Sequence, residues 1–198
     1  MSRNGPCYNA HTFELAAMSN ILADSPVSNN QSIDLAGTWE VWLRNDRPDD
    51  AQPTGQVHLP GSLDQAGIGT PNAEEGWLGG LSRRVSYVGP AWYRRSLEIP
   101  EEWVGRKLSL SLERVHWFSE LYVNGLTCGE QESLSVPHEY LFVADSRHIV
   151  LDLLIDNSIR VPIGRIGHAV TDWTQTNWNG AIGALTLQPA KESGKPFG

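Results

Sequence analysis

Strict alternation of apolar and polar residues is the feature that most restricts the fold of this chain. From Lys107 to Glu113 (KLSLSLE) every second residue is a leucine. From His148 to Asp156, Ile149, Leu151, Leu153 and Ile155 again occupy alternate positions and so share one face. A period of two places these side chains on one face of an extended strand, and one-sided alternation is typical of antiparallel sheets. We therefore expect strands rather than helices.

Short segments of this kind, separated by turns, continue along the chain. Asn124-Gly125 is a strong hairpin signal, and Gly89-Pro90 marks a turn between two extended pieces. Trp42 interrupts the polar set of a strand that runs through Trp39 to Leu43, so we expect that strand to be covered on both faces. No amphipathic helix and no repeat of fixed period is visible. The sequence predicts an all-β fold, a two-sheet antiparallel β-sandwich.

The domain limits follow from composition. Residues 1–31 are polar and rich in Ser and Asn, which predicts a disordered N-terminal tail. The sandwich domain is expected over 32–188, with a C-terminal tail over 189–198. Eight Trp, nineteen Gly and twelve Pro among 198 residues agree with short strands and many turns.

Charge and residue spacing exclude several classes of partner. A net charge of −8 with scattered basic residues argues against nucleic acid, which requires a positive stripe. The sequence contains no run of about 20 apolar residues, so we expect no membrane-spanning helix, and the N-terminus carries no clear signal peptide. The two cysteines, Cys7 and Cys128, do not indicate a disulfide framework. The six histidines lack zinc-site spacing, so we expect no cofactor or metal, although a structural calcium ion on a loop would be compatible with the sequence.

One stretch combines the side chains that suit a sugar. Residues 174–180 (TQTNWNG) place Thr174, Gln175 and Asn177 beside Trp178, and Asn179-Gly180 follows as a turn signal. Neutral polar groups bind sugar hydroxyls, and an aromatic ring binds the C–H face of a sugar. The alternative is that Trp178 is core and its neighbours cap a loop.

A second candidate platform is Trp77, which lies in the Gly-rich segment from Ser62 to Gly80. Connections of this length are uncommon unless they are functional or mobile. The alternative is that Trp77 anchors its loop to the sandwich.

Four motifs in the same order resemble a known family: residues 89–103 (GPAWYRRSLEIPEEW), 112–130 (LERVHWFSELYVNGLTCGE), 153–157 (LLIDN) and 168–187 (HAVTDWTQTNWNGAIGALTL). Together they are similar to the N-terminal sugar-binding domain of family 2 glycoside hydrolases, the superfamily of β-galactosidases, β-glucuronidases and β-mannosidases. The resemblance covers about residues 32–188 and implies a jelly roll of the galactose-binding type.

The resemblance also implies what this chain lacks. Retaining hydrolases of that family cleave glycosides with two Glu residues on a (β/α)₈ barrel, and a barrel alone needs about 250 residues. We therefore expect no hydrolase activity from this polypeptide by itself, and no catalytic residue is assigned.

The resemblance further implies a substrate-contacting Asp six residues before the glycine that matches Gly180. That position holds Thr174 here, which removes a charged acceptor, while Asp172, Gln175 and Asn177 stand near enough in sequence to replace it. The expected binding residues are Asp172, Thr174, Gln175, Asn177, Trp178, Asn179 and Trp77.

Three functions remain open at this point. The chain is a carbohydrate-binding module, a fragment or split subunit that supports the active site of a separate catalytic (β/α)₈ barrel, or a structural or protein-binding sandwich. The family resemblance slightly favours a periplasmic or secreted location.

Overall fold

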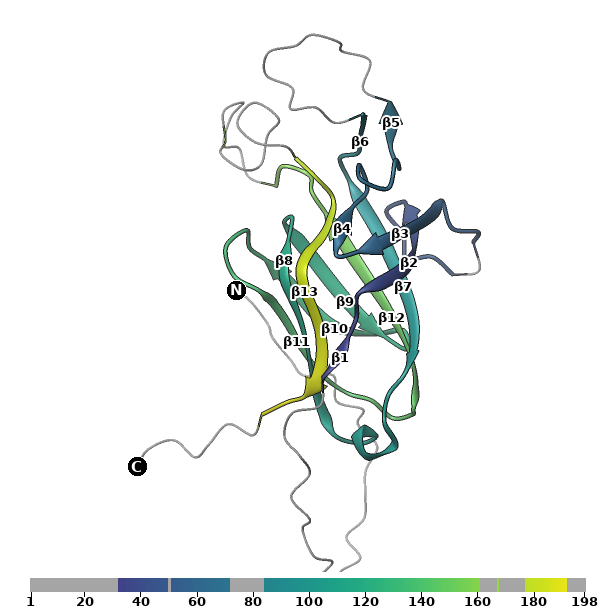
Figure 1. Cartoon of the computed structure of the whole chain (residues 1–198), viewed down its shortest axis with the longest axis vertical. Coiled ribbons are helices and arrows are strands. Elements are labelled where there is room, and N and C mark those ends of the chain that lie inside the picture. The colour runs from purple at the N-terminus through teal and green to yellow at the C-terminus, as the bar shows by residue number, and fades with distance from the viewer. Residues whose placement is uncertain (1–31, 50, 72–83, 161–166, 168–176, 192–198) are drawn as a thin grey trace, which may run out of the picture.

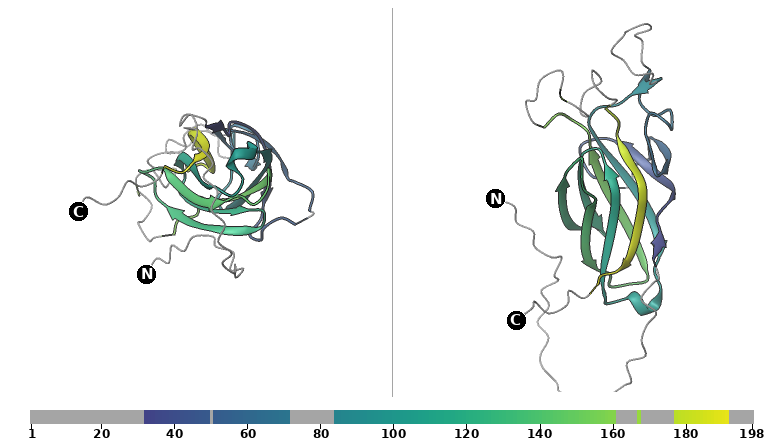
Figure 2. Two further views of the ribbon diagram at one scale, coloured as in Figure 1. Left: turned by 90° about the horizontal axis from the view of Figure 1, so that it is seen from below. Right: turned by 60° about the vertical axis from the view of Figure 1, so that its left-hand side comes forward.

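The structure is a computed structural model that describes residues 32–49, 51–71, 84–160, 167 and 177–191. Two antiparallel sheets pack face to face, and the strands of both run along the long axis of the molecule (Figures 1 and 2). The predicted all-β sandwich is therefore confirmed. One short 3₁₀-helix, η1 (Glu101–Trp103), follows Pro100.

The larger sheet has six strands in the order β10-β9-β12-β7-β2-β3. Its central strands pair over their whole lengths, because each residue of β12 faces one residue of β7 from His148↔Glu98 to Asp156↔Pro90. The strands of this sheet are β2 (Gly37–Leu43), β3 (Gly55–Leu59), β7 (Pro90–Glu98), β9 (Phe118–Val123), β10 (Leu126–Glu132) and β12 (His148–Asp156).

The smaller sheet has five strands, in the order β1-β13-β8-β11 with β4 paired to the start of β13. Its strands are β1 (Ile33–Asp34), β4 (Gly61–Ser62), β8 (Lys107–Val115), β11 (His138–Val143) and β13 (Gly180–Pro189). A separate two-stranded pair is formed by β5 (Thr70–Pro71), which lies within the Gly-rich segment, and β6 (Val85–Ser86), which follows that segment.

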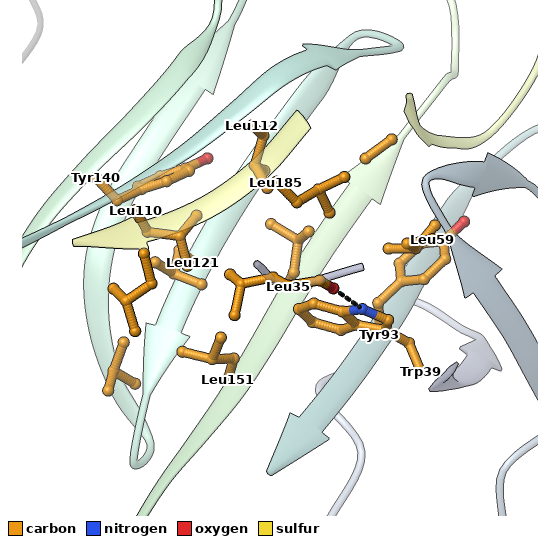
Figure 3. Packing of buried hydrophobic residues seen from close by; sticks show 14 of the residues in the cluster. Leu35, Trp39, Leu59, Tyr93, Leu110, Leu112, Leu121, Tyr140, Leu151 and Leu185 are labelled. Carbon is orange, nitrogen blue, oxygen red and sulfur yellow. Dashed lines mark hydrogen bonds between the residues drawn. The ribbon is translucent and has the colours of Figure 1, made fainter. Parts of the chain in front are cut away.

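The leucine alternation fills the space between the sheets. Leu108, Leu110 and Leu112 of β8 are at most 1% exposed, and they face the equally buried Ile149–Ile155 set of β12 across the interior. Figure 3 shows leucines from both sheets converging with Trp39 and Tyr93 on one core. Burial of such side chains contributes about 2 kcal/mol each relative to exposure, so the period-two pattern determines which face of each strand is internal.

The chain passes from the smaller to the larger sheet between β1 and β2, and buried donors stabilise this crossing. The carbonyl of Leu35 accepts hydrogen bonds from Trp39 Nε1 at 3.1 Å, drawn in Figure 3, and from Arg95 Nη1 at 2.5 Å. Arg95 Nη1 also donates to the carbonyl of Ala36 at 2.9 Å. Arg95 therefore binds main-chain carbonyls of its own domain.

The outer face of the larger sheet is covered by the loop that joins β2 to β3. Trp42 is 4% exposed and its Nε1 donates to the carbonyl of Ala51 at 2.8 Å. Arg94 pairs with Asp152, with 2.5 Å between Nε and Oδ1, and its Nη2 donates to the carbonyl of Pro48 at 2.7 Å. The expectation that Trp42 marks a strand covered on both faces is confirmed.

Candidate functional site

The loop end of the sandwich is formed by the residues that precede β7, β9 and β13 and follow β8, β10 and β12. Phe118, Asp156 and Pro90 lie side by side across three strands at this end. Residues 177–179 enter it directly before β13, so the described part of the predicted sugar-binding stretch lies here (Figure 1).

Asn179 is 1% exposed, and its side-chain amide is used within the protein. Its Oδ1 accepts a hydrogen bond from the Tyr93 hydroxyl at 2.6 Å. Its Nδ2 lies within hydrogen-bond distance of the carbonyls of Gly89 (2.9 Å) and Ile155 (3.1 Å). Burial raises the pKa of the Tyr93 hydroxyl well above its usual value, so this hydroxyl keeps the proton that it donates.

Asn157 and Asn177 complete an amide network with Asn179. Asn157 Nδ2 donates to Asn177 Oδ1 at 2.8 Å, and Asn177 Nδ2 donates back to the Asn157 carbonyl at 3.2 Å. Asn157 Oδ1 accepts from the backbone N–H of Gly89 at 2.9 Å. The amide network, Asn157, Asn177 and Asn179, therefore ties the end of β12 to the starts of β7 and β13, and all three residues are at most 4% exposed.

Gly180 is glycine because β4 passes too close for a side chain. Its φ is +152°, and a Cβ at this position would overlap the carbonyl oxygen of Gly61 and lie 2.9 Å from the Cα of Ser62. The Asn-Trp-Asn-Gly order is thus fixed partly by packing, because two buried amides and a close backbone approach surround a single residue that is only partly buried.

That residue is Trp178, which is half-buried. Its ring stacks on the imidazole of His116, with 5.1 Å between ring centroids and 28° between planes. Its carbonyl oxygen lies 2.8 Å from His116 Nδ1, which must therefore carry a proton and donate. His116 is itself 3% exposed, at the β8–β9 connection. Trp178 is held by its own backbone, by His116 and by the buried amides on either side.

The predicted binding residues therefore divide into two groups. Asn177 and Asn179 were predicted to contact a ligand, but the structure places both side chains in the interior, where protein groups occupy their polar atoms. Trp178 keeps part of its ring surface at the loop end. Trp77, Asp172, Thr174 and Gln175 lie outside the described residues, and their assignment stays a prediction.

Asn157 and His116 are the residues that sequence reasoning missed. Asn157 was assigned only to the end of a strand, in the LLIDN motif, and His116 was treated as an isolated histidine. A buried Asn after an apolar strand is a weak signal, because only the fold brings it to Asn177, twenty positions along the chain.

A small apolar cluster flanks this site. Trp117 and Phe118 pack with Leu134 and Leu154, and Arg160 lies 3.9 Å above the Phe118 ring. Three aliphatic side chains of the surrounding connections are strongly exposed, namely Val88 (55%), Val136 (59%) and Ile159 (50%). Exposed aliphatic side chains also occur away from the loop end, at Leu126, Leu141 and Val143.

A hydroxyl chain of Tyr140, Ser119 and His138 lies inside the sandwich. His138 Nε2 is 3.0 Å from the Ser133 carbonyl, which can only accept, so Nε2 carries the proton and Nδ1 accepts from Ser119 Oγ at 2.6 Å. Tyr140 then donates to Ser119 Oγ at 2.6 Å. Desolvation lowers the pKa of His138, partly offset by the Ser133 bond. His138 and Ser119 are fully buried, so this chain has no access to a substrate.

Among the described residues, no cluster of His, Cys, Asp or Glu could hold a metal ion, and no helix is long and apolar enough to cross a membrane. Cys128 lies half-buried in β10, where the pairing with β9 is irregular.

Neither protein-family models nor curated protein sequences match this chain. Solved structures do match. The chain superimposes on a β-glucuronidase from an uncultured Clostridium species with a TM-score of 0.60 and 18% identity, covering 85% of this chain and 31% of the enzyme. It matches a Bacteroides uniformis β-glucuronidase with a TM-score of 0.58 and 21% identity, covering 80% of this chain and 18% of the enzyme.

A third match is a GH2 β-galacturonidase from Eisenbergiella tayi, with a TM-score of 0.56 and 16% identity over 82% of this chain and 25% of that protein. The chain thus spans between about a fifth and a third of the length of these enzymes. The resemblance to family 2 glycoside hydrolases that the motifs indicated is confirmed at the level of the fold: this chain is a β-sandwich like one part of these enzymes.

Proposed function

We propose that this chain is a carbohydrate-binding β-sandwich domain whose sugar-binding surface is centred on Trp178. The observation that carries the proposal is the way this ring is held. It is half-buried, stacked on His116, and placed between two asparagines whose amides are fixed in the interior. A ring that is already immobile loses little conformational entropy when a ligand stacks on it.

The proposed site has fewer side chains available for sugar hydroxyls than the sequence suggested. Because Asn177 and Asn179 are used internally, hydrogen bonds to sugar hydroxyls would come from the other predicted residues, Asp172, Thr174 and Gln175. Trp178 would supply the apolar surface for the C–H face of the sugar. A single ring with a few polar neighbours suits a weak, selective site for a terminal sugar.

Calorimetric titration of the purified chain with galactosides, glucuronides, mannosides and plant oligosaccharides tests this proposal. We expect saturable binding to one class, abolished in Trp178→Ala and partly retained in Trp178→Tyr, which keeps an aromatic face. Leu126→Ala removes an equally apolar surface side chain at the opposite end of the sandwich and should bind normally. Absence of binding to every sugar, or binding that survives Trp178→Ala, would contradict the proposal.

A second function is favoured by the exposed aliphatic side chains at the loop end. In this alternative, Val88, Val136 and Ile159 contact a separate catalytic (β/α)₈ barrel, and the sandwich supports the active site of a retaining glycoside hydrolase. The match to only part of several glycoside hydrolases agrees with it.

Charge substitutions at this surface test the second function. Ile159→Asp combined with Val136→Asp should abolish co-purification with a co-expressed barrel domain. The control is Leu141→Asp, which replaces a comparably exposed side chain of β11, far from the loop end. This variant should leave co-purification with the barrel unchanged. Equal co-purification of both variants would exclude a barrel contact at this surface.

A further inference from the structure

Two Asn-Gly pairs lie in the described part of the chain, and the fold places them in opposite surroundings. Asn179-Gly180 is buried at the loop end. Asn124-Gly125 forms the exposed turn between β9 and β10, where φ is +48° at Asn124 and +83° at Gly125. The same dipeptide therefore occurs once in the interior and once at the surface.

Asn-Gly is the dipeptide in which the backbone can most easily attack the preceding side chain, because glycine has no Cβ to obstruct the approach. The glycine nitrogen forms a bond to Cγ of the asparagine, the Cγ–Nδ2 bond breaks, and ammonia leaves with the proton of that nitrogen. Water then opens the cyclic imide at either carbonyl, giving aspartate or isoaspartate. No reactant other than water is required.

A cation lies against the exposed pair. Arg47 Nη1 would be 3.4 Å from a Cβ placed on Gly125, and its guanidinium is held over the Tyr122 ring at 5.1 Å from the centroid. This Nη1 is buried and has no hydrogen-bond acceptor within the described part of the chain. A fixed positive charge beside the turn favours loss of the Gly125 amide proton and stabilises the negative charge that develops during ring closure.

We propose that Asn124 is a self-modification site, at which Arg47 promotes attack by the Gly125 nitrogen on the Asn124 amide. Two contacts hold the Asn124 side chain: Oδ1 accepts from the Val150 N–H at 2.8 Å, and Nδ2 is 3.5 Å from Asp145 Oδ1. The second contact is long, so the amide nitrogen that must leave is weakly held. Asn179 Nδ2, in contrast, is fixed by buried carbonyl acceptors.

The product changes the hairpin. Replacement of Nδ2 by a carboxylate oxygen puts two negative charges together at Asn124 and Asp145, and isoaspartate adds a backbone atom to a turn that needs a positive φ. Both products weaken the contacts of the turn with β12, at the end of the sandwich away from Trp178.

The test is a time course of the intact chain at mildly alkaline pH, read by peptide mass spectrometry that separates Asn124 from Asn179. We expect conversion at Asn124 and none at Asn179, whereas both should convert in denaturant. Arg47→Gln should slow Asn124 conversion several-fold, and Arg47→Lys should retain most of the rate. Arg44→Gln, which removes the same charge from an exposed position nearby, should have no effect.

Thermal melts confirm that each variant is folded before rates are compared. Arg47→Lys keeps the positive charge, so its rate separates the effect of charge from any local loss of structure in Arg47→Gln. Equal conversion at Asn124 and Asn179 in the folded chain would overturn the proposal. Equal rates in Arg47→Gln and Arg44→Gln would remove the role of Arg47.

Discussion

The amide network and the hydroxyl chain are two buried polar clusters that achieve full hydrogen bonding in different ways. Asn157, Asn177 and Asn179 use groups that do not titrate, and they bind main-chain atoms of Gly89, just before β7, and of Ile155 and Asn157, at the end of β12. Tyr140, Ser119 and His138 form a linear series whose direction is set by the Ser133 carbonyl. The first cluster is insensitive to pH, while the second depends on a neutral histidine. The two clusters are comparably buried, but only the hydroxyl chain is expected to lose stability in acid.

The largest expected effect is on the amide network. Asn179→Ala removes the acceptor of the Tyr93 hydroxyl and one donor to the carbonyls of Gly89 and Ile155, so we expect a loss of about 3 kcal/mol in the free energy of unfolding. Urea denaturation at neutral and mildly acidic pH measures it. The loss should be the same at both pH values, and a strongly pH-dependent loss would contradict the contrast between the clusters.

A smaller loss is expected in the hydroxyl chain. Ser119→Ala leaves the Tyr140 hydroxyl without its acceptor and His138 Nδ1 without its donor, which costs about 2 kcal/mol. Ser119→Cys is a matched variant of similar volume that keeps a weak donor, and it should lose less. If denaturation gives Ser119→Ala wild-type stability, another group or a water molecule satisfies both partners.

His138→Gln separates pH dependence from packing, with an expected cost of about 1 kcal/mol at neutral pH. Because burial lowers the pKa of His138 in the folded state, the unfolded state takes up a proton first as the pH falls below about 6.5. The contribution of neutral His138 to the free energy of unfolding is therefore complete above that pH, and it is lost as the pH falls toward the pKa of His138 in the folded state.

The glutamine introduced by His138→Gln cannot titrate, so the midpoint of denaturation in this variant should change less between about pH 7.5 and pH 5.5 than in the wild type. Ser119→Ala, which disturbs the same hydroxyl chain but keeps the histidine, serves as the comparison and should keep a pH-dependent midpoint. A wild-type slope in His138→Gln would assign the acid response elsewhere.

The smallest effect on stability is expected at Trp178. Its ring is partly exposed and its backbone is held by neighbouring amides, so Trp178→Ala should cost less than about 1 kcal/mol. Circular dichroism during thermal unfolding measures this. A loss as large as that of Asn179→Ala would mean that the ring, rather than the amide network, organises the loop end.

The sequence was sufficient where one local pattern decides the structure. The alternating leucines of β8, the Asn124-Gly125 turn and the covered face at Trp42 are all properties of a few adjacent residues. The candidate site was less predictable. Asn177 and Asn179 have the same local composition whether they face a ligand or the core, and the choice is made by Tyr93 and Asn157, which lie up to 86 positions away.

The pairing of the first strand with the last has a mechanical consequence. Ile33 of β1 faces Leu187 of β13, so the chain enters and leaves the domain side by side, at the end away from Trp178 (Figure 1). Tension applied through the two flanks would load the β1–β13 bonds one after another, as in a zipper, instead of all together in shear. β1 would peel away at low force, and the guanidinium of Arg95 on the carbonyls of Leu35 and Ala36 is the first point at which that peeling would stop.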